Sequence, residues 1–357
     1  MACPFCTAPR PTLAQQIERA DMALMGDVVA ADGSTWKLRV QQSVKPGEEA
    51  AGRLIEIANR STDGNPTPGE LLLATATKRD KPSAEVSWSI VVLNEASFAY
   101  VARSPTTRDA TAKRLSYFLP FLEHADPVIA EDAYLEFAHA PLDEIGKLAD
   151  RLPVDRLRDW LADADLPPER KGLYGLLLGL SASAQGRADI ADDFWGWITA
   201  PASDFRSGFD GVLGGYLWMG RQEALARLED RYLGDPPGAF GDLRHLQTAM
   251  RVYHDYGRDV ALEEFMRGYR RFLDHPAVAA LAVADLSRWQ DWQSVDRVAS
   301  IFGQPGYDDP VTDRAIIGYL LACPLPEARR RVVRLRKLLP DRVTAAERTA
   351  TTTSGGK

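Results

Sequence analysis

RLSYFLPFLEHADPVIAEDAYLEFAHAPL, residues 114–142, is the stretch of this 357-residue chain that decides the fold. Its apolar residues recur at helical spacing on both sides of a short turn, first at Leu115, Phe118, Leu119 and Leu122 and then at Val128, Ile129, Ala133, Leu135 and Phe137. Asp126 followed by Pro127 is typical of a helix start, because the aspartate accepts an unpaired backbone N–H and the proline has none. The stretch therefore predicts a pair of antiparallel helices.

The pattern of this stretch returns towards the end of the chain. The tripeptide DPV occurs at residues 126–128 and 309–311, and each copy is followed after twelve residues by Pro-Leu. FLEH at 121–124 has a counterpart in FLDH at 272–275, again just before an apolar helix. Such echoes indicate an array of helical repeats, which stack because no single unit can bury its own apolar face. The histidine that ends each FL[ED]H copy is expected to form a structural hydrogen bond at a helix end.

Residues 107–340 are helical in pattern, and many of their segments begin at proline or at an acidic residue. Two series of glycines interrupt this region, at Gly172, Gly175 and Gly179 and at Gly208, Gly211 and Gly215. Each glycine costs a helix about 1 kcal/mol relative to alanine, so the series predict a close backbone approach between stacked helices. Neither series matches the GxGxxG or P-loop pattern of a phosphate-binding loop. Residues 341–357 end in TTTSGGK and are predicted to be disordered.

The first hundred residues show a strand-like period after one short helix. Apolar and polar residues alternate over 35–45, and turn-rich pieces with Gly, Pro and Asp separate the other apolar runs. The predicted strands cover residues 22–31, 35–45, 53–60, 70–77, 85–94 and 96–103. Five or six short strands with few helices favour a small OB-like β-barrel.

The composition is that of an ordinary globular protein, with 45% hydrophobic and 26% charged residues and a net charge of −7. No apolar run approaches the ~20 residues that a membrane-spanning helix needs. The basic run RRRVVRLRK at 329–337 could bind nucleic acid or an acidic membrane, but its apolar residues at core-like spacing favour a solvated helix face. We therefore expect neither a transmembrane segment nor nucleic-acid binding.

Cys3-Pro4-Phe5-Cys6 is the sharpest local motif. A CxxC pair can act in thiol redox chemistry, but a thioredoxin-like site needs a strand directly before it, and only two residues precede Cys3 here. A zinc site needs about two further ligands, and Cys323 and the five histidines show no matching second pair. A structural disulfide or a pair of unused thiols is favoured over a redox or metal-binding function. Cys323 is expected to lie in the core, and no cofactor is indicated.

Tryptophans are frequent in the helical region, where Trp289 and Trp292 lie three residues apart. At this spacing both side chains share one helix face or a tight corner, so they could form an aromatic patch that contacts a partner. Their apolar neighbours favour packing between repeats instead. The pair remains the candidate for partner binding, and no catalytic set is predicted, because Ser, His and Asp residues show no hydrolase order.

Three segments resemble a family of uncharacterised bacterial exported proteins: CPFC with the following TLAQQIERADMALMGDVV, YFLPFLEHADPVIAEDAYLEFA with RKGLYGLLLGL, and YLLACPLPEARRRVVRLRKLLPD. The resemblance covers nearly the whole chain and implies a two-part layout, with the CPxC placed just after a removed signal peptide. FLPFLEHADPVIAEDAYLEFA also resembles a HEAT-type repeat, and the cysteine-led opening is similar to netrin-like and TIMP-like barrels. The family has no established activity, so the resemblance implies architecture and export without naming a function.

These observations predict a small OB-like β-barrel over residues 1–106, a HEAT-like α-helical array over 107–340 and a tail over 341–357. The function that they favour is a non-enzymatic scaffold, whose array binds a protein partner. The alternatives are a thiol-redox or metal-binding protein that uses Cys3 and Cys6, and an enzyme with a cleft between the two domains. The family resemblance implies a periplasmic or exported protein. If the chain is complete it is expected in the cytoplasm, since no signal peptide is visible.

Overall fold

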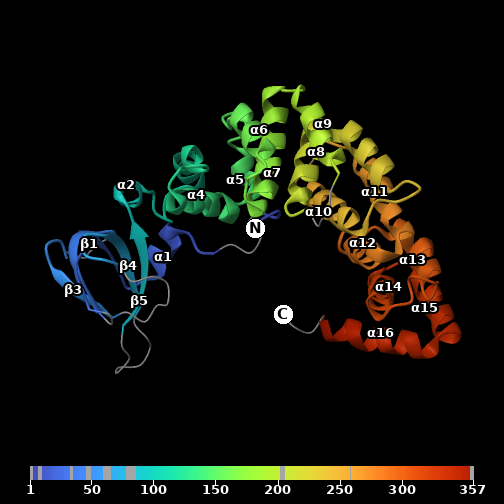
Figure 1. The fold of residues 1–357 in the computed structure, drawn as a ribbon. Helices are drawn as coiled ribbons and strands as arrows, with labels where there is room; N and C mark the ends of the chain where they lie inside the picture. The colour runs from blue at the N-terminus through green and yellow to red at the C-terminus, as the bar shows by residue number, and fades with distance from the viewer. Residues whose placement is uncertain are drawn as a thin grey trace. The chain divides into compact units, whose positions relative to one another are not determined.

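The computed structural model describes residues 3–6, 10–32, 35–45, 50–58, 66–77, 86–201, 206–257 and 259–353. The chain divides into two compact units, Met1–Leu148 and Ala149–Lys357, whose elements are labelled in Figure 1. The helices that follow the sheet, up to residue 146, belong to the first unit. The compact units therefore differ from the predicted domains, which placed the boundary between residues 106 and 107.

Unit 1 contains a curled antiparallel sheet of five described strands (Figure 1). The strands are β1 (Met22–Asp32), β2 (Thr35–Ser43), β3 (Leu54–Ala58), β4 (Leu71–Thr77) and β5 (Ser87–Leu93), in the order β3-β2-β1-β4-β5. The central strand β1 is paired with β2 on one side and β4 on the other, so its backbone N–H and C=O groups are bonded along both edges. One face of the sheet buries a core of Leu24, Val28, Trp36, Leu38, Val40, Ile57, Leu72 and Ala74.

The sixth predicted strand, residues 96–103, is instead a helix, α2 (Glu95–Arg103). Asn94 and Ser97 form a reciprocal cap: the Asn94 side chain accepts from the Ser97 backbone N–H at 3.0 Å, and Ser97 Oγ accepts from the Asn94 N–H at 2.8 Å. Tyr100 and Val101 then fall on the buried face of the helix. The prediction was wrong here because a local cap outweighed a run of aromatic and β-branched residues.

The stretch that decides the fold forms the predicted antiparallel helices α3 (Thr111–Phe118) and α4 (Pro127–His139), which pack on each other. A single 3₁₀ turn, Leu119–Phe121, follows α3. Asp126 caps α4, since its side chain accepts from the Val128 N–H at 2.8 Å. The unit also contains α1 (Leu13–Arg19) and α5 (Leu142–Gly146).

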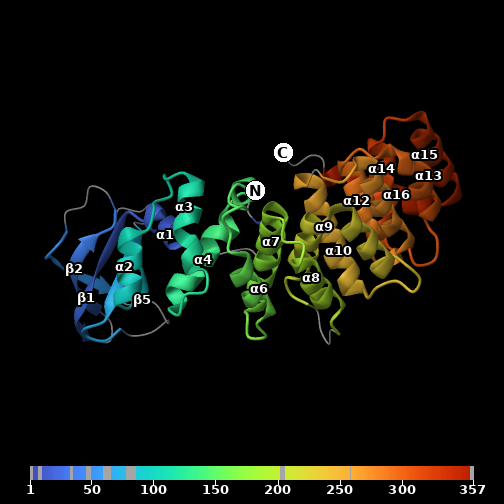
Figure 2. The same ribbon diagram turned by 90° about the horizontal axis from the view of Figure 1, so that it is seen from above.

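Unit 2 is an array of helices, each of which packs against helices that come one or two places before or after it in the chain. The helices are α6 (Val154–Ala162), α7 (Pro168–Gln185), α8 (Ile190–Thr199), α9 (Phe209–Tyr232), α10 (Phe240–Tyr256), α11 (Leu262–Arg270), α12 (Pro276–Arg288), α13 (Val295–Ile301), α14 (Pro310–Ala322), α15 (Pro326–Leu338) and α16 (Pro340–Thr353), with 3₁₀ turns at Arg271–Asp274 and Trp292–Ser294. Helix α7 packs on α9, α9 on α10, α10 on α12, α12 on α14 and α14 on α16, and Figure 2 shows several of these neighbours side by side. Helix α9 is kinked at Arg221, whose backbone is non-helical (φ 49°, ψ −122°).

The glycine series bring α7 and α9 into backbone contact, as the sequence predicts. A Cβ atom on Gly211 would overlap the carbonyl oxygen of Gly172, and one on Gly179 would overlap that of Gly215. A Cβ on Gly175 would lie 2.8 Å from the Cα of Val212. No side chain fits between the two helices at these positions, so glycine is required for their packing.

Buried ion pairs join further helices of the array. On α10, Arg251 Nε donates to both carboxylate oxygens of Asp285 on α12, at 2.9 Å each. On α16, Arg342 donates from Nε and Nη2 to the two oxygens of Asp313 on α14, at 2.7 Å each. Both aspartates are buried. Two-pronged contacts of this kind fix distance and orientation together, so they set the register of neighbouring helices.

The end of the chain is helical where disorder was predicted. Helix α16 runs from Pro340 to Thr353 and buries Val343 and Ala346, which are 0% and 4% exposed. This amphipathic spacing outweighs the polar character of the sequence around it. The predicted disorder over 341–357 is therefore wrong as far as Thr353, and residues 354–357 lie outside the described part of the chain.

Candidate functional site

The N-terminal cysteines lie against the end of α4. The sulfur atoms of Cys3 and Cys6 are at disulfide-bonding distance, and their Cα atoms lie 5.5 Å apart, a usual spacing for a disulfide. Cys3 is buried and its N–H donates to the Ala138 carbonyl at 2.9 Å, while Phe5 between the cysteines is buried as well. Among the described residues, no three His, Cys, Asp or Glu side chains are placed to share a metal ion. The pair is therefore positioned to fasten the N-terminal segment.

A buried carboxylate pair on α4 holds the same segment further along. Asp132 and Glu136 are one turn apart, and each is 3% exposed. Asp132 accepts from the Leu13 N–H at 2.6 Å and from the Tyr100 hydroxyl at 2.8 Å, and Glu136 accepts from the Arg114 guanidinium. Burial raises the pKa of Asp132 to about 7 and also raises the pKa of Glu136. Raised carboxyl pKa values occur at catalytic sites, but Asp132 binds the start of α1, Glu136 binds Arg114, and neither residue lines the neighbouring hollow of unit 1.

Sequence reasoning missed this network. The signal was the placement of Asp132 and Glu136 four residues apart within an otherwise apolar helix, where a carboxylate needs a buried partner. More exposed contacts extend the same attachment: Arg10 forms an ion pair with Glu131 at 2.7 Å, and the Arg10 carbonyl lies 2.9 Å from His139 Nε2. Helix α4 thus holds the described N-terminal residues at Cys3, Arg10 and Leu13.

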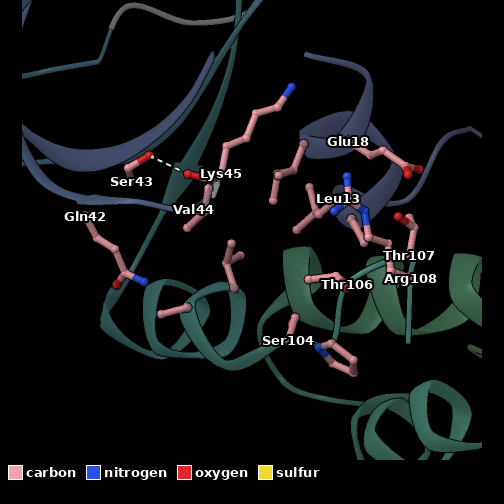
Figure 3. A pocket seen from close by; sticks show the side chains of 15 residues that line it. Leu13, Glu18, Gln42, Ser43, Val44, Lys45, Ser104, Thr106, Thr107 and Arg108 are labelled. Atoms are coloured by element: carbon pink, nitrogen blue, oxygen red, sulfur yellow. Dashed lines mark hydrogen bonds between the residues drawn. The ribbon is translucent and has the colours of Figure 1, made fainter. Parts of the chain in front are cut away.

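A hollow of about 440 Å³ opens in unit 1 between α1, the end of β2 and the segment after α2 (Figure 3). Its walls are mostly apolar, with Leu13, Ile17 and Val44 among them. The Lys45 ammonium group is engaged by the Ala20 carbonyl, and Arg108 stands exposed at the rim. The described lining residues include no histidine or cysteine, so they offer neither a thiol nucleophile nor an imidazole base.

The structure places Trp289 and Trp292 in two different aromatic clusters. The Trp289 ring stacks on His254 at 3.8 Å between ring centres and meets Tyr269 edge-on at 4.6 Å. Trp292 meets Tyr319 at 5.2 Å. Both tryptophans are half-buried between neighbouring helices. This agrees with the packing role that their apolar neighbours in the sequence favour. A partner-binding role for the pair stays a prediction.

The other residues weighed from the sequence have structural surroundings. His124 Nδ1 accepts from the Asp126 N–H at 3.0 Å, which confirms the expected bond at a helix end, whereas the His275 side chain makes no such capping bond. Burial lowers the pKa of His275. Cys323 is buried with 3% exposure, as expected of a core cysteine.

An exposed surface with two hollows lies over α12, α14 and α16 in unit 2. We call it the α12–α14 surface and define it by Ala280, Leu281, Ala284, Val311, Arg314, Ala315, Gly318 and Ala345. A hollow of about 400 Å³ lies between α12 and α14, and another of about 510 Å³ lies between α14 and α16. Val311, which is 57% exposed, and Arg314 line both hollows and so form a ridge between them.

Sequence reasoning missed the α12–α14 surface. Alanine and glycine occur on both buried and exposed faces of apolar helices, so they do not show which face a neighbouring helix covers. Gly318 shows this well, since a Cβ at this position would meet no atom within 4 Å. The glycines of α7 and α9 are also helical glycines, but they lie in contact with the backbone of the opposite helix. Only the stacking of the helices distinguishes the two cases.

Comparison with known proteins does not assign this chain to a family. No family model matches the chain, and no curated protein and no solved structure is detectably similar to it. The resemblances to an exported bacterial family, to HEAT repeats and to netrin-like barrels therefore stay predictions. Among the described residues, no helix has the length and apolar character needed to cross a membrane.

Proposed function

We propose that this chain is a non-enzymatic interaction protein whose helical array binds a protein partner through the α12–α14 surface. The observation that carries the proposal is the pair of hollows on either side of the exposed Val311. An exposed surface that combines aliphatic and charged side chains with hollows for individual side chains is a common form of a protein-binding site. Small residues such as Ala284 and Ala315 leave room for a partner's larger ones.

Arg314 gives the α12–α14 surface a polar contact at its centre. Its side chain is exposed and makes no ion pair or side-chain hydrogen bond with the described residues. An arginine in this setting binds carboxylates in a two-pronged manner, and arginine is frequent among the residues that dominate binding energy. The partner segment that fits combines aliphatic side chains with an acidic residue between them.

The architecture supports an interaction role as well. A sheet in which β1 lies between β2 and β4, with β3 and β5 at the edges, has the strand order of an OB-like barrel. Stacked helices that contact only their neighbours are typical of HEAT-like repeats, which present extended binding surfaces. We assign the two units to these classes as part of the proposal.

The Cys3–Cys6 pair supports a place in an oxidising compartment, where such disulfides persist. The redox alternative has one observation in its favour: Cys6 is partly exposed while Cys3 is buried, and exchange requires an accessible sulfur. Intact-mass measurement after incubation with reduced glutathione separates the two roles. A retained disulfide supports the structural role, and rapid formation of a mixed disulfide supports the redox role.

A site-specific cross-link tests the proposed surface. A photo-reactive phenylalanine derivative at Ala284 should yield one discrete adduct with a cellular protein, because this exposed position borders the hollow between α12 and α14. The same group at the exposed Ala164, in the turn after α6, should yield none. The adduct, once identified by mass spectrometry, supplies the partner for direct binding measurements.

Gly318 offers a matched pair of variants for those measurements. Gly318→Phe should fill the hollow and weaken binding by at least tenfold without loss of stability, because its Cβ meets nothing within 4 Å. Gly318→Ala should bind like the wild type. Failure to obtain a discrete adduct at Ala284, or an adduct that survives Gly318→Phe, would contradict the proposal.

A further inference from the structure

Helix α15 carries the densest positive charge of the chain on an exposed face. Residues 329–337 hold six arginine and lysine side chains, and the helix buries only Ala328, Val332 and Leu335. We define the basic face as Arg329, Arg330, Val333, Arg334 and Lys337, all of which are exposed. Residues 330, 333, 334 and 337 follow at three- and four-residue spacing, so they lie together opposite the buried side.

The acidic groups nearby neutralise only part of this charge. Arg331 pairs with Asp296 at 2.8 Å, Arg336 with Glu347 at 2.5 Å, and Arg330 with Glu327. Arg329, Arg334 and Lys337 make no ion pair with the part of the chain that the structure describes. An excess of three positive charges therefore remains on a helix whose protein carries a net charge of −7.

Aliphatic side chains stand among these cations. Val333 is 51% exposed within the basic face, and Leu338 and Leu325 at the two ends of α15 are 63% and 40% exposed. Residues 326–338 contain no aromatic side chain on which a nucleobase could stack. Cations combined with exposed aliphatic groups match the interface of an anionic bilayer, where phosphates lie directly above hydrocarbon.

We infer that the basic face of α15 docks the protein onto an anionic lipid bilayer. The arginine and lysine side chains bind lipid phosphates, while Val333 and Leu338 enter the headgroup region. Because the rest of the chain is acidic, repulsion from the same bilayer orients the protein with this face towards the membrane. None of the described residues that line the hollows of the α12–α14 surface comes from α15, so this inference does not depend on the proposed function.

Vesicle flotation with the full chain tests the inference. The protein should float with phosphatidylcholine vesicles that contain one-third phosphatidylglycerol, should not float with pure phosphatidylcholine, and should be released by high salt. Arg329→Glu/Arg334→Glu/Lys337→Glu should weaken partitioning roughly 100-fold or more, since each cation near the surface contributes about a factor of five. Val333→Ser/Leu338→Ser should weaken it less and equally at low and high salt.

A control of equal charge separates docking from general attraction. Arg19→Glu/Arg151→Glu/Arg267→Glu makes the same change in net charge at exposed positions on other helices and turns, and should float like the wild type. Equal loss in the two triple variants would overturn the inference, and so would wild-type flotation no greater with phosphatidylglycerol than without it. Binding to an acidic polypeptide but not to vesicles would assign the basic face to a protein instead. Circular dichroism of each variant verifies that the helices are intact.

Discussion

Helix α4 in unit 1 and the α7–α9 pair in unit 2 are both surrounded by other elements, yet they are fixed by opposite means. Helix α4 is held through buried polar groups, with Asp132 bonded to the start of α1 and to Tyr100. Helices α7 and α9 are held by backbone contact at the positions where glycines face the other helix. The first attachment depends on buried carboxylates, whereas the second depends on glycines, which do not titrate. The comparison shows that a helix can be fixed by directional bonds or by shape alone, and the two respond to different perturbations.

The largest effect is expected where shape alone holds the helices. Gly179→Leu/Gly211→Leu should cost about 5 kcal/mol of unfolding free energy, because each overpacked site costs ~1–3 kcal/mol and the obstacle here is backbone. Urea unfolding followed by circular dichroism measures it. Gly196→Leu/Gly318→Leu is the matched control, since a Cβ at either position meets nothing within 4 Å. Equal destabilisation of the two variants would refute the account of the seam.

The second effect concerns pH and should appear only in the polar attachment. Burial raises the pKa of Asp132 to about 7 from an ordinary value of 3.8, so the folded protein holds this proton more tightly than the unfolded chain. Its contribution to stability is therefore full below about pH 4 and is lost as the pH rises through 7. Between these limits the wild type should lose about 4 kcal/mol relative to Asp132→Asn.

Urea titrations at several pH values measure that difference directly. Asp143→Asn, an exposed change on the neighbouring α5, should follow the wild type at every pH. A difference between wild type and Asp132→Asn that does not vary with pH would show that the carboxyl group is not buried as described. The glycine variants should keep the wild-type dependence on pH, because they leave Asp132 and its partners unchanged.

The smallest effect is expected at the disulfide. Cys3→Ser/Cys6→Ser should cost about 2 kcal/mol or less, because the bond closes a loop of only four residues and removes little entropy from the unfolded chain. The loss should be confined to unit 1, and hydrogen exchange should rise at the Cys3 and Leu13 amides that bond to α4. Unfolding of the whole unit would instead assign the pair a central role in its stability.

Much of the fold could be predicted because it depends on patterns of residues that are close together in sequence. The DPV helix starts, the period-two strands and the glycine seam each depend on neighbouring residues or on a strong steric requirement, and each is confirmed. Helix α2 and the end of α16 were missed for opposite reasons. A short cap at Asn94 outweighed strand-like composition, and a two-residue apolar contact at Val343 and Ala346 outweighed polar composition.

The candidate sites were harder to predict, because they depend on which surfaces the stacking leaves open. Cys3 and Cys6 were found from spacing alone, and their pairing needs no long-range contact. Trp289 and Trp292 share a spacing but not an environment, since each contacts a different helix. The small residues of the α12–α14 surface give no signal in sequence, because exposure of an alanine is decided by a helix more than thirty residues away.

The glycine seam also determines where the array can bend. A stack of helices is elastic at its junctions, where side chains slide past one another, and each junction deforms separately from the rest. At the glycines of α7 and α9 the two backbones touch, so we expect this junction to resist sliding. The junctions of α10, α12, α14 and α16 are formed by side chains, and ion pairs fix α10 to α12 and α14 to α16. We therefore expect the α7–α9 pair to bend less than the side-chain junctions around it.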